Sequence, residues 1–398
     1  MLNLGGRVRQ ARLLAGYTQD KLSEELKKWG YAATKAVISK YEKNKSMPPA
    51  QFLILAASIL DVPASYFTHQ PTLSVEWLAF RRHSALPTRE QEAIKQYATD
   101  VAELQIELQS LLYPKMVARL PERISVNSPE SAEKAAMALR TFWGLDNHPI
   151  DSLVRTAEDH QVVVVGWHKH AGEFDGLSGW CNQKYPITVV NTLVDAERRR
   201  FTLAHELGHL VMDTSEMSEK ESEKFANRFA ATFLVPADCA IDELGTRRTN
   251  LDWDELKILK RKYGLSMSAW VHRAQDLDII SKHYANQLCR ERDERGWHHK
   301  EPVDYLWDEI PSKLEQMARR TVSEGLINPE QIHRVFPKWV FETEMKTTTP
   351  HHLTVYDLLK MPEAQRQQVM AEAFALAANE DFETFEAFDD MDFNDDAF

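Results

Sequence analysis

The chain has 398 residues, of which 43% are hydrophobic and 10% aromatic, with a net charge of −12. This length exceeds a single hydrophobic core and the composition is typical of folded protein, so we expect two or three domains and exclude a wholly disordered chain. No apolar run approaches the roughly 18 residues that cross a bilayer, and the N-terminus lacks the pattern of a secretory signal. Three cysteines without a Cys-x-x-Cys pair argue against disulfides or a thiolate metal site, and together these features predict a cytoplasmic protein that does not bind membranes.

Charge is unevenly distributed along the chain. Residues 1–50 contain ten Lys or Arg and four Asp or Glu, a net charge of +6, which leaves −18 for residues 51–398. Because DNA is a polyanion, any contact with nucleic acid is expected at the N-terminal end. A solvated charged surface would give the same asymmetry.

Residues 1–67 predict five short helices separated by turn residues. The first has an apolar face and ends at Gly16, and Gly30 ends the second, which Thr18 can cap. The third spans about 34–43, and two more follow. The segment is therefore expected to be all-α.

This segment resembles the Xre/Cro family of helix-turn-helix repressors. The resemblance is carried by Arg12, Thr18-Gln19 and the run Ile38-Ser39-Lys40-Tyr41-Glu42-Lys43. It implies that the third helix enters the major groove of an operator and that the chain forms a homodimer, since such repressors read half-sites in pairs. A helical bundle that makes only protein contacts is the alternative. The residues implied to contact bases or phosphates are Arg9, Gln19, Thr34, Lys35, Ser39, Lys40, Lys43 and Lys45.

The chain from 68 to 114 predicts a linker followed by one long helix. Residues 68–87 contain scattered prolines and no clear pattern, whereas Thr88 to about Leu112 has amphipathic periodicity. This helix could pair with another chain or pack on the next domain.

Residues 115–245 predict a mixed α+β domain. Apolar runs bounded by turn residues predict strands at about 162–165, 177–180 and 187–190. Helical patterns cover 131–143, 150–160, 196–212 and 219–233.

The motif His205-Glu206-Leu207-Gly208-His209 lies in the third of these predicted helices. Residues four apart share one helix face, so both imidazoles can bind one ion, and Glu206 can act as general base on a metal-bound water. Apolar flanking residues place the helix inside the protein, which argues against two satisfied surface histidines. Glu223 on the next helix is the expected third ligand, with Glu219, Glu221 and Asp213 as rivals.

The chain over about 125–245 resembles the ImmA/IrrE metallopeptidase family. The resemblance rests on four runs: Gly176 to Trp180, Ile187 to Asn191, Arg199 to His209 and Glu223 to Pro236. It implies a gluzincin-like fold, one Zn²⁺ per chain held by His205, His209 and Glu223, and cleavage of a helix-turn-helix repressor by a reaction in which Glu206 is the base. Phe225 stands where the family often has a second acid.

Three further site features are less determined by the sequence. Short strands near the motif suggest that substrate adds as an extended edge strand. Tyr185 and His170 are candidates for stabilising the oxyanion, and Cys181 is expected to be a small buried side chain.

The predicted fold is mainly α with a small β-sheet. The expected organisation is a helix-turn-helix domain at 1–67, a linker and connecting helix at 68–114, an α+β metallopeptidase domain at 115–245, a helical extension at 246–305, a helical region at 306–378 and an acidic, phenylalanine-containing tail at 379–398. This organisation predicts a transcriptional regulator with a zinc endopeptidase domain. It would control a toxin–antitoxin, phage-related or stress locus by cleaving a repressor, a toxin or another protein encoded nearby, or itself. A non-proteolytic antitoxin or repressor with a zinc sensor module is the alternative, and so is a protein that neutralises a toxin through its acidic tail.

Overall fold

The N-terminal residues fold into the predicted set of short helices. The computed structural model describes residues 4–68, 73–80, 86–168, 174–298, 300–305, 309–328 and 332. Thr18 and Thr34 cap two of the helices through their hydroxyl oxygens. The elements are α1 (Leu4–Leu14), α2 (Gln19–Lys28), α3 (Lys35–Glu42), α4 (Ala50–Leu60) and the 3₁₀ helix η1 (Ala64–Phe67), and they enclose a small core of their own.

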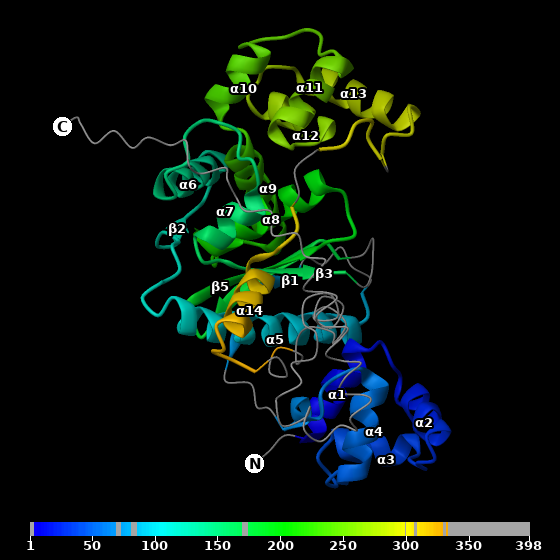
Figure 1. Ribbon diagram of the computed structural model, residues 1–398. Coiled ribbons are helices and arrows are strands. Elements are labelled where there is room, and N and C mark those ends of the chain that lie inside the picture. The colour runs from blue at the N-terminus through cyan, green and yellow to red at the C-terminus, as the bar shows by residue number, and fades with distance from the viewer. Residues whose placement is uncertain are drawn as a thin grey trace, which may run out of the picture. The chain divides into compact units, whose positions relative to one another are not determined.

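A four-stranded mixed sheet forms the centre of the next part of the chain (Figure 1). Its order is β1-β4-β5-β3, with β3 parallel to β5 and the other two pairings antiparallel. The strands are β1 (Val75–Phe80), β3 (Val163–Trp167), β4 (Gly176–Cys181) and β5 (Tyr185–Asn191). A separate parallel pair joins β2 (Ile124–Ser125) to β6 (Met212–Asp213). The three predicted strands are confirmed.

Strand β1 corrects the interpretation of 68–87 as linker. Val75 and Trp77 alternate with the exposed Glu76, which is the period of a half-buried strand. The partner strand β4 is about a hundred residues further along the chain, so no local hairpin signal marks β1. The prolines at 71 and 87 on either side made this segment look like linker, although it forms a short edge strand.

Helices cover both faces of the sheet (Figure 1). Helix α5 (Thr88–Leu112) packs on one face, where its alanines share a core with Val163 and Val165 of β3. Helix α8 (Ala196–Val211) packs on the other, together with α6 (Pro129–Phe142), α7 (Leu153–Asp159) and α9 (Glu219–Leu234). The apolar side of α5 therefore packs within the chain, on the next domain, which is one of the two predicted alternatives.

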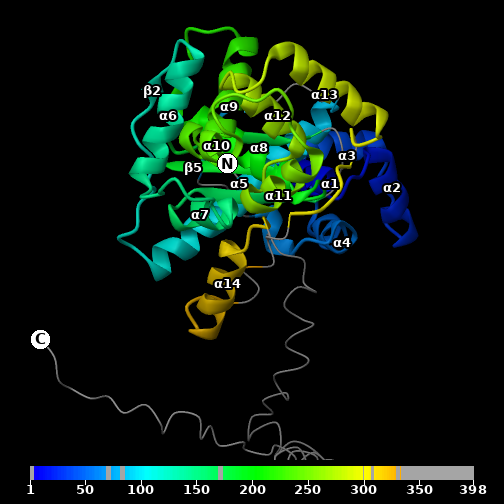
Figure 2. The same ribbon diagram turned by 90° about the horizontal axis from the view of Figure 1, so that it is seen from above.

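The helices after α9 extend the same core. They are α10 (Ala237–Leu244), α11 (Trp253–Tyr263), α12 (Met267–Asp276) and α13 (Lys282–Glu294), and they gather beside α9, away from α5 (Figures 1 and 2). A last helix, α14 (Lys313–Ser323), lies against α5. No helix in the described ranges combines the length and apolar character needed to cross a bilayer. The predicted tail at 379–398 and most of the predicted region at 306–378 lie outside the described residues.

Candidate metal centre

Helix α8 carries the His-Glu-x-x-His motif into the interior. His205 and Glu206 are almost fully buried, and His209 is 6% exposed. Gly208 allows α9 to approach closely, because a Cβ there would lie 3.1 Å from the Phe229 ring. The close approach brings the first turns of α9 beside the two imidazoles.

Three donor atoms meet between α8 and α9. His205 Nε2 lies 3.1 Å from His209 Nε2, and each of these atoms lies 3.3 Å from a carboxylate oxygen of Glu223. Ligands about 2.05 Å from a tetrahedral ion are about 3.3 Å from one another. The three side chains therefore fit one divalent cation, and this set is the metal-ligand group found among the described residues.

Asn227 orients the first imidazole. Its amide oxygen lies 2.9 Å from His205 Nδ1, so that ring nitrogen carries the proton and donates it. His205 Nε2 is then the ring nitrogen that faces His209 and Glu223. Such outer partners hold metal-binding histidines in one tautomer. Asn227 follows Glu223 by one helical turn, and that spacing is the sequence signal that identifies it.

The Glu223 carboxyl is held ionised. Partial burial alone would raise its pKa, but hydrogen bonds and charge from His205 and His209 outweigh burial and hold the pKa well below its ordinary value. An ionised carboxylate beside two imidazoles offers three ligand atoms that suit a cation.

A residue of strand β4 forms a hydrogen bond with the Glu206 carboxylate of α8. The Ser178 hydroxyl donates to Glu206 Oε2 at 2.7 Å, and both side chains are buried. Gly176 leaves room for the same carboxylate, since a Cβ there would lie 2.8 Å from Glu206 Oε1. Sequence reasoning did not identify Ser178, although it faces the same side of β4 as Gly176 by the period-two rule.

The rival ligands lie elsewhere. Glu221 forms the capping box of α9 with Ser218, and Asp213 accepts the backbone N–H of Ser215. Glu219 is exposed at the start of α9.

The remaining predicted site features have mixed outcomes. Tyr185 begins β5 and is half-buried, whereas His170 lies outside the described residues. Cys181 is fully buried as expected, and burial raises the pKa of its thiol to about 12. A group of that pKa stays protonated near neutral pH.

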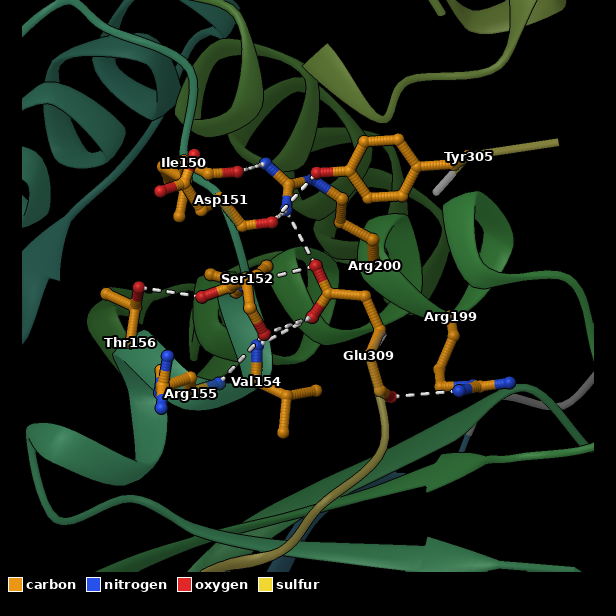
Figure 3. Close-up of polar contacts among 11 residues, drawn as sticks. Ile150, Asp151, Ser152, Val154, Arg155, Thr156, Arg199, Arg200, Tyr305 and Glu309 are labelled. Atoms are coloured by element: carbon orange, nitrogen blue, oxygen red, sulfur yellow. Dashed lines mark hydrogen bonds and ion pairs between the residues drawn. The ribbon is translucent and has the colours of Figure 1, made fainter. Parts of the chain in front are cut away.

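A buried polar network anchors the N-terminal end of α8 (Figure 3). Glu309, fully buried, accepts hydrogen bonds from the backbone N–H groups of Leu153 and Val154 at the start of α7. It also forms an ion pair with Arg200 of α8 at 2.6 Å, while its own carbonyl accepts from Arg199. We name the described residues 300–305 and 309–314 the C-terminal strap, because Glu309 bonds both to α7 and to Arg200 of α8. The sequence did not predict the strap, because no local pattern indicates that Glu309 pairs with Arg200, 109 residues earlier in the chain.

The residues predicted to contact DNA divide into two groups. Lys40, Lys43 and Lys45 are exposed on or just after α3, and Thr34 caps that helix. Ser39 is half-buried. The three lysines are therefore exposed to solvent.

The second group already has partners within the chain. Each of its members contacts an acidic residue: Lys35 pairs with Asp20 at 2.7 Å, Gln19 donates to Glu42 at 2.7 Å, and Arg9 pairs with Glu92 of α5 at 2.5 Å.

The outer edge of β4, the strand that contacts Glu206, is occupied. Strand β1 pairs along it in antiparallel register, from Val75 opposite Cys181 to Phe80 opposite Leu177. A substrate strand can add there only if β1 leaves.

Comparison with known families agrees with this geometry. Residues 8–67 match the family model described as helix-turn-helix, and residues 157–275 match the IrrE N-terminal-like domain of the M78 peptidases. The second match includes all three metal-site residues and continues through α12. No curated protein matches the chain. The chain thus joins an Xre-type helix-turn-helix domain to an IrrE N-terminal-like metallopeptidase domain.

Proposed function

We propose that the chain is a DNA-binding transcriptional regulator whose second domain is a zinc-dependent endopeptidase. It acts by cleaving a repressor, a toxin or another protein encoded nearby, or its own chain, and so controls a toxin–antitoxin, phage-related or stress-response locus. The observation that carries the proposal is the tetrahedral spacing of His205, His209 and Glu223 beside a buried glutamate.

The donor set favours zinc. Two neutral imidazoles and one carboxylate, with a fourth position left for water, are typical of catalytic zinc sites. Bound Zn²⁺ polarises a peptide carbonyl and makes water a better nucleophile. One ion per chain is expected.

Glu206 is the proposed general base. Its carboxylate takes a proton from the attacking water and passes it to the departing amine nitrogen. Ser178 fixes one carboxylate oxygen by its hydrogen bond, so the base keeps one orientation.

The N-terminal helix-turn-helix domain is the proposed DNA-binding part of the chain. Exposed Lys40 of α3 and the exposed Lys43 and Lys45 just after it suit contact with phosphates. The chain is proposed to bind operator DNA as a homodimer.

The testing experiment compares the wild type with Glu206→Gln. The zinc-loaded protein is incubated with proteins encoded next to it, and products are identified by mass spectrometry. The wild type is expected to cut one partner or itself, while Glu206→Gln binds equal zinc and cuts nothing. Equal cutting by both would overturn Glu206 as the base. Zinc binding without cutting by either would favour a sensor module.

A further inference from the structure

Strand β4 is the part of the sheet that contacts the proposed catalytic base. Ser178 donates to Glu206 Oε2, and Gly176 lies against the same carboxylate. Any strand that pairs along the outer edge of β4 therefore passes beside Glu206. Peptidase substrates commonly bind in this extended, main-chain-paired form.

Strand β1 occupies this edge as a peptide would. The two strands are antiparallel, with Trp77 opposite Gly179 and Ala79 opposite Ser178. The apposition is close, because a Cβ on Gly179 would lie 2.5 Å from the Glu76 carbonyl oxygen. Residue pairing thus places Ala79 of β1 directly opposite Ser178, which donates a hydrogen bond to Glu206.

The pairing register between β1 and β4 shifts between Trp77 and Ala79. Leu78 has no pairing partner between Trp77 and Ala79, which is the pattern of a β-bulge. Leu78 packs toward the core around α8, whereas Val75 and Trp77 pack toward the core around α5. The bulge leaves Leu78 of β1 without a paired residue on β4, next to Ser178.

β1 is also the least buried strand of the sheet. None of its described side chains at 75–78 is fully buried, while β3, β4 and β5 consist mainly of buried residues. Elements with little buried apolar surface open at low free-energy cost. An incoming peptide would replace the backbone hydrogen bonds that β1 gives up.

We infer that β1 is an intrasteric strand: it covers the substrate-binding edge of β4, and a polypeptide substrate binds by displacing it. The inference rests on the proposed peptidase function. β1 joins the helix-turn-helix domain to α5, so its release would also change the connection between the two domains. The recognised substrate is an extended polypeptide read through its main chain.

A reversible disulfide tests the inference in the full-length protein. Val75 lies directly opposite Cys181 and on the same side of the sheet, so Val75→Cys can form a cross-strand bond. Directly opposite residues have Cα atoms about 4.5–5.5 Å apart, within disulfide range. Copper phenanthroline forms the bond and dithiothreitol breaks it. Wild type under the same oxidant and Val75→Ser are the controls.

The zinc-loaded proteins are assayed on denatured β-casein as an unfolded probe. Reduced Val75→Cys should cut at the rate of Val75→Ser, and the oxidised form at least about tenfold more slowly, because the substrate-competent state is removed. Dithiothreitol should restore the rate. Equal rates for the oxidised and reduced forms would overturn the inference.

Hydrogen exchange supplies a readout that does not depend on activity. Backbone amides of β1 should exchange at least about tenfold faster than those of β3 and β5 in the wild type, because β1 opens locally. Exchange of β1 as slow as that of β5 would identify a permanent strand and overturn the inference. If β1 opens but no form cuts casein or neighbouring proteins, the proposed peptidase function fails and the displaceable strand stands.

Discussion

Asn227 shows how one residue outside the ligand set controls the centre. Its amide oxygen fixes the proton of His205 on Nδ1, so that Nε2 is the ring nitrogen that can bind a cation. It occupies α9 one turn beyond Glu223, so the same helix supplies both a ligand and the support for another ligand.

Replacing Asn227 should weaken zinc binding without unfolding the protein. We expect Asn227→Ala to lower zinc affinity by about 10–100-fold, the usual effect of removing such a partner. Asn227→Asp retains an acceptor oxygen and should keep wild-type affinity or exceed it. Competition with a fluorescent chelator measures both variants, and unchanged affinity in Asn227→Ala would refute the role.

The residues of the centre differ in how far the sequence determines them. His205, Glu206 and His209 could be predicted because helix geometry alone places residues four apart on one face. Glu223 required the extra assumption that the next helix packs against α8. Ser178 could not be predicted as a partner of Glu206, because only the packing of β4 on α8 brings them together.

At the scale of elements, the C-terminal strap completes the metal domain. Glu309 joins the start of α7 to Arg200, five residues before the first histidine, and Tyr305 donates to the carbonyl of Asp151 (Figure 3). Both partners of the ion pair are fully buried. The strap therefore helps to set the position of α8 from outside the predicted 115–245 boundaries.

Removal of Glu309 should be strongly destabilising. In Glu309→Ala the Arg200 guanidinium stays buried without its carboxylate, which costs about 3–5 kcal/mol of unfolding free energy. Glu315→Ala is the matched control, because Glu315 pairs with Arg319 at the exposed surface, where a pair contributes less than about 1 kcal/mol. Denaturant titration measures both, and equal losses would contradict the anchoring role.

Helices and strands with strong local patterns were predictable, and those fixed by distant partners were not. The pattern of 88–112 gave the bounds of α5, and the valine run gave β3 to within a few residues. β1 and the strap depend on β4 and on α7 and α8, which lie far away in the sequence. Their local composition resembles linker because their stabilising contacts are not local.

Across the whole molecule, a buried polar cluster joins the helix-turn-helix domain to α5. Arg7 pairs with Asp100 at 2.9 Å, and the Tyr66 hydroxyl donates to the same carboxylate at 3.0 Å. Leu13 of α1 enters the core beneath α5. The face of α1 that carries Arg9 is therefore turned toward α5, while Lys43 and Lys45 after α3 are exposed.

Salt dependence of DNA binding distinguishes these two surfaces. Lys43→Ala should reduce the slope of log affinity against log salt by about one, because one phosphate contact is lost. Arg9→Ala should leave the slope unchanged, since Arg9 is engaged with Glu92. Fluorescence anisotropy with a random-sequence duplex measures both, and a larger change for Arg9→Ala would contradict this assignment.

Metal content is the most direct test of the central claim that His205, His209 and Glu223 hold one zinc ion. It is measured by elemental analysis of the purified full-length protein after dialysis. We expect about one zinc per chain for the wild type, for Glu206→Gln and for the control Glu219→Gln, whose side chain is exposed one turn earlier on α9. His205→Ala and Glu223→Gln should lose the ion. A wild type without zinc, or a Glu223→Gln variant that binds zinc as tightly as the wild type, would contradict the account.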